Sequence, residues 1–393
     1  MGFICLSFPW LFQSVLAVQI LACSAVILLL VIRLSNLRNS VGSALFSVER
    51  LSIGELLFPA AVAWLFTLSW DQPVLYCISL LLLTLADSAG ALAGSKLGKQ
   101  YYQTAGASKT LEGSIAFFIT AALCTALPLY TLTHLPIAQV ILLALNIALF
   151  TTAVEGASGH GIDNLLIPIG AFLLLDYYTG LSGHQLLIRS TALMILLAVL
   201  LATHHKHTLN GGAILTALLY SFAAFTLGGI PCLLATILLF IRHIIVQHRL
   251  TREQVFVHSI DVILAISIPS LAWLTLGRGQ SLGYTESQFG FICTLAIIIY
   301  MLNTGTQKHL HQKRPNMWPG MFLTVLVLTP SLFIKVPMQH YLPVLLIAPV
   351  LAWLYFHWRE PTGQATIYHW IKLSLLAAIG SIANMLITLV ILS

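Results

Sequence analysis

Two short segments of this chain gather the residue types that phosphate chemistry uses. Charged residues make up only 8% of the 393 positions, so acids and lysines are scarce. The first segment combines carboxylates, lysines, glycines and hydroxyl groups: Asp87, Gly90, Gly94, Lys96, Gly98, Lys99, Lys109, Thr110, Glu112, Gly113 and Ser114. Lysines supply positive charge to phosphates, and the free amides at a helix N-terminus bind anions. We therefore predict a site for a phosphorylated ligand.

The second segment is a glycine-rich loop with an acid at each end. It runs from Glu155 through Gly159 to Asp163 and Asn164, with Pro168 beyond. Two carboxylates and an amide suit Mg²⁺, which favours one or two carboxylates together with phosphate oxygens. Ordinary helix capping by Asp163 is the alternative. The two segments hold four of the twelve acids in the chain, and their gathering at one membrane face favours the metal interpretation.

The glycines of the first segment have two interpretations. Gly90, Gly94 and Gly98 are spaced four apart, so they share one face of a helix. Such a face allows close helix packing through small residues, and it also lets phosphate oxygens approach the backbone. A nucleotide-binding P-loop is excluded, because three residues instead of four separate the last two glycines. In addition, Gln100 follows Lys99, where a P-loop requires Ser or Thr.

The elements that must position these residues are membrane-spanning helices. The mean hydropathy is +0.94 and 59% of the residues are hydrophobic, far above soluble domains. We predict an all-α, polytopic integral membrane protein, because apolar runs of about 17–25 residues recur and each spans a hydrocarbon core. About fourteen spans are expected, near residues 10–32, 53–70, 73–94, 113–133, 136–155, 163–178, 184–202, 209–226, 228–247, 255–276, 286–303, 319–334, 340–357 and 369–392.

The basic residues orient these spans. With the N-terminus outside, fifteen of the 18 Lys and Arg residues fall in cytoplasmic segments, and only Arg189, Arg278 and Lys335 fall opposite. This is the asymmetry of the positive-inside rule. Both polar segments then lie on the cytoplasmic face. The formal net charge of +6 is explained by these loops, so the expected partners are membrane lipids and no nucleic acid.

Taken together, the two segments resemble the motifs of the CTP-dependent polyprenol kinases, the family of dolichol kinase and phytol kinase. The first motif, an acid with small residues and then a Lys-Thr/Ser-Leu-Glu-Gly-Ser turn, matches the segment from Asp87 to Ser114. The second motif, a glutamate followed at a distance by Asp-Asn and a proline, matches Glu155, Asp163, Asn164 and Pro168. The resemblance covers about residues 30–202.

The resemblance implies that the γ-phosphate of CTP is transferred, with Mg²⁺, to the hydroxyl of a long-chain isoprenoid alcohol such as phytol, a polyprenol or dolichol. It implies Mg²⁺ ligation by Asp87 and Asp163, and an alcohol-orienting or basic role for Glu112 or Glu155. The phosphate-binding set would be Lys109 with Lys96 or Lys99, together with Gly90, Gly94, Gly98, Thr110, Gly113, Ser114 and Asn164. We expect a bacterial plasma membrane, with the active site on its cytoplasmic face.

The two halves of the chain differ in content. We expect residues 1–207 to form the catalytic membrane domain and residues 208–393 to form a second, non-catalytic membrane domain, because the acids of the second half do not gather at one loop. Two alternatives stay open. A CDP-lipid-forming cytidylyltransferase is the nearest, although the paired-aspartate motif of that class is missing. A transporter built from two inverted halves is the other, although the charged residues cluster at one face.

Overall fold

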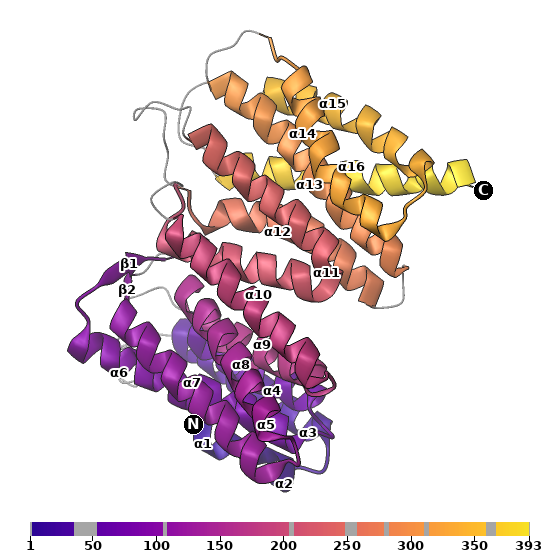
Figure 1. The fold of residues 1–393 in the computed structure, drawn as a ribbon. Coiled ribbons are helices and arrows are strands. Elements are labelled where there is room, and N and C mark those ends of the chain that lie inside the picture. Colours follow the sequence, from indigo (N-terminus) through magenta and orange to yellow (C-terminus); the bar gives the residue numbers. More distant parts are fainter. Residues whose placement is uncertain are drawn as a thin grey trace. The chain divides into compact units, whose positions relative to one another are not determined.

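The computed structural model describes residues 2–34, 53–104, 108–203, 208–247, 258–278, 283–309, 314–358 and 367–392, which are almost entirely helical (Figure 1). The chain divides into two compact units. Unit 1 comprises residues 1–195 and 210–215, and unit 2 comprises residues 196–209 and 216–393. The predicted all-α, multi-pass membrane fold is confirmed.

Among the described residues, ten helices are long and apolar enough to cross a membrane. Two shorter apolar helices, Gly54–Leu68 and Trp318–Ile334, add to these. The helix Gly211–Gln247 is interrupted at Gly229, whose φ of 68° and ψ of −164° are not helical. It therefore consists of two helical segments, which correspond to two of the expected spans. The total of fourteen spans and the orientation of the N-terminus stay predictions. Of the basic residues that assign the cytoplasmic side, seven lie outside the described residues: Arg38, Arg50, Lys206, Arg249, Arg252, Lys313 and Arg359.

Unit 1 holds both polar segments. Its elements are α1 (Gly2–Cys5), α2 (Phe8–Leu11), α3 (Val15–Leu34), α4 (Gly54–Leu68), α5 (Pro73–Leu81), η3 (Leu82–Ala86), α6 (Asp87–Leu97), β1 (Tyr101–Gln103), β2 (Ser108–Thr110), α7 (Leu111–Leu132), α8 (Ile137–Ala157), α9 (Asp163–Thr179) and the first part of α10 (Gly183–Ala202). Helix α7 packs against α6 and α8, and α9 packs against α8, α4 and α5. This packing brings the N-terminal ends of α6, α7 and α9 and the C-terminal end of α8 within reach of one site.

Two local features of unit 1 depart from the sequence analysis. The expected spans 73–94 and 113–133 leave residues 95–112 as the loop between them, but α6 continues to Leu97 and an antiparallel hairpin of β1 and β2 follows. Figure 1 shows this hairpin at the end of α6 and the start of α7. The hairpin was missed because each strand has only three residues, too few for a period-2 pattern to show. In addition, η3 is a π-helix directly before Asp87, and such π-bulges occur frequently at functional sites.

Unit 2 contains the remaining helices. They are α11 (Gly211–Gln247, of which the first residues belong to unit 1), α12 (Ile260–Arg278), α13 (Tyr284–His309), α14 (Trp318–Leu328), the 3₁₀ helices η6 (Thr329–Ile334) and η7 (Met338–His340), α15 (Tyr341–Trp358) and α16 (Ile367–Leu392).

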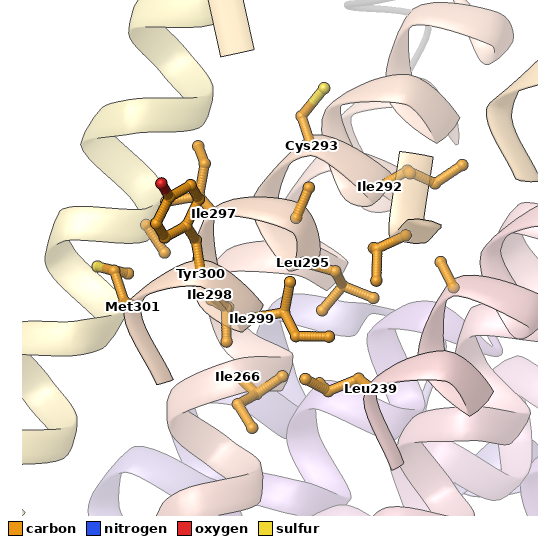
Figure 2. Packing of buried hydrophobic residues seen from close by; sticks show 14 of the residues in the cluster. Leu239, Ile266, Ile292, Cys293, Leu295, Ile297, Ile298, Ile299, Tyr300 and Met301 are labelled. Carbon is orange, nitrogen blue, oxygen red and sulfur yellow. The ribbon is translucent and has the colours of Figure 1, made fainter. Parts of the chain in front are cut away.

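Helix α13 is the centre of unit 2. It packs against α12, α14, α15 and α16, and every residue from Ser287 to Met301 is buried. Figure 2 shows its side chains leaving the helix in several directions, with Leu239 of α11 and Ile266 of α12 packed beside them. Within its most apolar stretch 83% of residues are buried, against 11% in α3. A helix that is apolar on all sides is stable only when surrounded, whereas the exposed apolar side chains of α3 suit contact with lipid.

Candidate active site

The hairpin of β1 and β2 positions Lys109. In its register Tyr102 lies opposite Lys109, so the two side chains project from the same face of the ribbon. Thr104, at the end of β1, donates a hydrogen bond of 3.0 Å from its hydroxyl to the carbonyl oxygen of Ala157. This contact fastens the hairpin to the last turn of α8, where carbonyl groups lack partners within the helix.

Lys109 joins the two polar segments of the sequence. Its Nζ lies 2.6 Å from Glu155 Oε1 and 3.8 Å from Asp163 Oδ2, and it also donates to the backbone carbonyl of Glu155. Between 17% and 19% of each of these three side chains is exposed. Ion pairs at this depth are screened less by water than surface pairs. The fold thus brings one lysine and two acids from separate motifs into one cluster.

Asp87 extends this cluster. It is the first residue of α6, is half-buried, and lies close enough to Asp163, Glu155 and Lys109 for their charges to interact. Within the part of the chain that the structure describes, Lys109 is therefore the one basic side chain that interacts with all three carboxylates. Such a surplus of negative charge is costly at membrane depth unless a further cation compensates it.

The donor set fits Mg²⁺. Glu155 Oε2 is buried and has no hydrogen-bond partner among the described residues. An oxygen in this state can bind a cation or accept a proton from a substrate. In the described ranges, no group of three or more acid, histidine or cysteine side chains is arranged to hold a metal ion. If Mg²⁺ binds here, it would take one or two of the carboxylates of Asp87, Glu155 and Asp163, because Mg²⁺ keeps several waters and also binds substrate phosphates.

The glycines of the first segment serve close packing of α6 on α7. A Cβ atom added to Gly113 would lie 2.9 Å from the carbonyl oxygen of Gly90 and 3.2 Å from Cα of Gly94. A Cβ on Gly94 would lie 2.8 Å from Thr110 Oγ1, and one on Gly98 would lie 2.6 Å from Thr110 Cγ2. The small-residue packing interpretation therefore accounts for these positions. Protein atoms occupy the face that phosphate oxygens were expected to approach.

The turn before α7 has local structural roles. Thr110 is the N-cap of α7, and its side-chain oxygen accepts a hydrogen bond of 3.2 Å from the amide of Gly113. The Glu112 carboxylate accepts from the amide of Gln100 at 3.3 Å. Lys96 and Lys99 are exposed, and the charge of Lys99 lies near Glu112. Glu112 therefore lies outside the cluster that Lys109 forms with Glu155 and Asp163.

The start of α9 gives the Asp163 carboxylate two contacts. Asp163 is the first helical residue after the N-cap Ile162, and its Oδ1 accepts a hydrogen bond of 3.0 Å from the amide of Asn164. Its other oxygen, Oδ2, lies 3.8 Å from Lys109 Nζ, so a helix-end role and a site role are both met. Asn164 donates from Nδ2 to the carbonyl oxygen of Gly54 at 2.9 Å. The loop before it turns through His160 and Gly161, which have φ values of 59° and 83°. Asn164 thus ties the site end of α9 to the start of α4.

Sequence reasoning missed Tyr102. Its hydroxyl lies 2.8 Å from Ser114 Oγ, and burial raises the pKa of this phenol, so it stays protonated at neutral pH. The side chain lies near both Lys109 and Glu155. In the sequence, Tyr102 stands only seven positions before Lys109 of the Lys-Thr motif. That these two residues pair becomes clear only when the register of the hairpin is known.

Comparison with known proteins agrees with the resemblance seen in the motifs. The chain is 31% identical over 134 residues to the phytol kinase of Synechocystis sp.. The alignment covers 33% of this chain and 57% of that relative, so the chain matches little more than half the length of the relative. No family model matches the chain, and no solved structure matches significantly. The predicted similarity to the kinases that include phytol kinase is confirmed.

Proposed function

We propose that this protein is a membrane-embedded lipid kinase that transfers the γ-phosphate of CTP to the hydroxyl of a long-chain isoprenoid alcohol. The observation that carries the proposal is the contact of Lys109 with Glu155 and Asp163 in a half-buried site. It unites the two motifs, since Lys109 and Glu155 are 46 positions apart in the sequence. The similarity to a phytol kinase supports the same reaction class. CTP as donor comes from the family resemblance alone.

Lys109 is the residue assigned to the phosphates. Its ammonium group is held by two carboxylates and a carbonyl oxygen, so it is fixed in place before a nucleotide binds. Phosphoryl transfer depends mainly on positioning and on stabilisation of the charge on the transferred group. A fixed cation meets both needs, because it costs no reorganisation when charge develops in the transition state.

Glu155 is the residue assigned to the alcohol. The alcohol oxygen attacks the γ-phosphorus, the bond to the β-phosphate oxygen breaks to release CDP, and the hydroxyl proton passes to a carboxylate. The oxygen Oε2 of Glu155 is buried and has no hydrogen-bond partner within the described residues, so it is available to accept that proton. Glu112, the other candidate, already accepts a hydrogen bond from the Gln100 amide.

Asp87 and Asp163 are the residues assigned to Mg²⁺. Their carboxylates lie close enough for their charges to repel each other, and bound Mg²⁺ would neutralise phosphate charge during transfer. The isoprenoid tail would lie among the apolar helices of unit 1, with its hydroxyl at the membrane interface. We place the enzyme in a bacterial plasma membrane with this site on the cytoplasmic face, in line with the distribution of basic residues.

The position of the label in CTP tests this proposal. Purified protein is given γ-labelled or α-labelled CTP with Mg²⁺ and, in turn, phytol, geranylgeraniol, farnesol or a long polyprenol. A kinase moves only the γ-label into lipid, whereas a cytidylyltransferase moves the α-label and releases pyrophosphate. Equal or faster turnover with ATP would overturn the assignment of CTP. Solute flux in liposomes without label transfer would favour the transporter alternative.

A further inference from the structure

Tyr102 is held from three directions at the edge of the site. Its hydroxyl contacts Ser114 of α7 at 2.8 Å. Either hydroxyl group can be the donor in this contact. Ser114 Oγ also lies 3.2 Å from the carbonyl oxygen of Thr110, so the phenol is linked to the first turn of α7.

Two glycines leave the space that the Tyr102 side chain occupies. A Cβ atom on Gly156 of α8 would lie 2.9 Å from the Tyr102 hydroxyl oxygen. A Cβ atom on Gly211 would lie 2.9 Å from Cδ2 of the same ring. Gly211 opens α11, whose first residues group with unit 1, and Asn210 accepts a hydrogen bond of 2.9 Å from the Ala213 amide at that end. The ring is therefore clamped between α8 and the start of α11.

The hairpin needs such contacts in order to hold Lys109. It has only three residue pairs, and a two-stranded hairpin of this size is marginal in isolation. Tyr102 is the cross-strand partner of Lys109, so displacement of the ring moves the strand that carries the lysine. Thr104 supplies the other described anchor of β1.

We propose that Tyr102 is a positioning residue that fixes Lys109 against Glu155 and Asp163. The expected loss of kcat rests on the proposed function. The expected displacement of Lys109 rests on the hairpin geometry alone. Neighbouring Tyr101 offers a matched control, because it has the same side chain on the adjacent strand position, is 67% exposed, and projects from the opposite face.

Kinetics of Tyr102 variants form the first arm of the test. Tyr102→Phe removes one hydrogen bond and should lower kcat about three- to tenfold. Tyr102→Ala frees the strand and should lower kcat by about 10². KM for CTP should change less than about twofold in Tyr102→Phe, because the interaction is expected to matter in the transition state. Tyr101→Phe and Tyr101→Ala should stay within about twofold of wild type. An unchanged kcat in folded Tyr102→Ala, or an equal loss in Tyr101→Ala, overturns the proposal.

A rescue experiment tests the clamp itself. Gly156→Ala places a methyl group against the Tyr102 oxygen and against Leu215 Cδ1, which would lie 2.4 Å away. Leu215 can move because the contact involves the end of a flexible side chain, so the phenol is the firmer obstacle. Gly156→Ala should lower kcat, and adding Tyr102→Phe should restore part of the loss by removing the oxygen. Strictly additive losses contradict this geometry.

The second arm needs no enzymatic activity. An amine-reactive reagent followed by mass spectrometry compares labelling of Lys109 with labelling of exposed Lys99 in the same molecule. Tyr102→Ala should raise Lys109 labelling several-fold relative to Lys99, and Tyr101→Ala should leave the ratio unchanged. An unaltered ratio in Tyr102→Ala overturns the positioning role. If wild-type protein phosphorylates none of the alcohols but the ratio changes as expected, the proposed function fails while the positioning role stands.

Discussion

The site end of unit 1 and the centre of unit 2 are both built from apolar helices, but they differ in charge and in regularity. At the site, a lysine and three acids lie in half-buried positions beside a π-helix, a hairpin of two three-residue strands and a row of glycines. Around α13, every residue from Ser287 to Met301 is buried and the side chains are mainly aliphatic. Charge and local irregularity therefore gather in one region, while regular apolar packing fills the other.

Thr294 and Glu155 illustrate two ways of placing a buried polar group, although buried polar atoms without a hydrogen-bond partner among the described residues occur in both units, for example Asn146 Oδ1 and Asn384 Oδ1. In unit 2 a buried hydroxyl such as Thr294 donates to the carbonyl oxygen one turn earlier, that of Gly290, at 2.8 Å, which satisfies it within its own helix. In unit 1 the Glu155 carboxylate has one oxygen on Lys109 and the other without a hydrogen-bond partner in the described ranges. The comparison teaches that a hydroxyl satisfied within its own helix leaves no charge to balance, whereas the carboxylates at the site of unit 1 carry an electrostatic cost that a bound cation would offset.

The largest expected effect is on phosphoryl transfer, in Asp87→Asn and Asp163→Asn. Each keeps the size of the side chain and removes its charge, so each should slow transfer by about 10²–10⁴ if both acids serve one metal. The double variant should lose little more than the worse single variant. Steady-state rates with γ-labelled CTP measure this. A folded Asp163→Asn protein with near-normal activity would contradict the metal assignment.

The next effect separates the two candidate glutamates. Glu155→Gln should lower kcat by about 10²–10³, because the proton acceptor is lost. Glu112→Gln should lower it less than about threefold, because an amide oxygen still accepts from the Gln100 amide. Expression and thermal stability of both variants serve as controls. A larger loss in Glu112→Gln than in Glu155→Gln would reverse the assignment.

Leu295→Ala tests the other side of the comparison. This side chain of α13 is fully buried, so its truncation should cost about 2–5 kcal/mol of stability. The transfer rate per folded molecule should stay within about twofold of wild type, if unit 2 contributes no catalytic group. Thermal unfolding in detergent is measured beside the kinase assay. A loss of specific activity with unchanged stability would show that unit 2 takes part in the reaction.

The smallest expected effect is a gain of stability in Asp87→Asn. Without Mg²⁺ the Asp87 carboxylate is half-buried and lies near the carboxylates of Asp163 and Glu155, so its neutralisation should stabilise the folded protein by about 1 kcal/mol. The same substitution abolishes most activity, which would be a direct trade of stability against function. Thermal unfolding in a chelator measures it. Lower stability in Asp87→Asn under these conditions would show that the carboxylate is already compensated.

The sequence by itself determined the class of protein and most of the helices, and it named Asp87, Lys109, Glu155 and Asp163 among its candidate site residues. A spanning helix is defined locally, because the hydropathy and the length of one apolar run decide whether that run can cross the membrane. The Lys-Thr-Leu-Glu-Gly-Ser turn and the Asp-Asn pair are also local, because each motif lies within a few consecutive residues. Their chemistry follows from residue types, which folding does not change.

Only the tertiary structure decided which of these residues meet. The contact of Glu155 with Lys109, and of Glu112 with the Gln100 amide instead, depends on how α7 and α8 pack, and the close packing of Gly113 depends on its contact with Gly90. Tyr102 gained a role only through its register opposite Lys109. Local patterns carry no information on such contacts, because they depend on distances between segments that lie far apart in the chain and are set by helix packing.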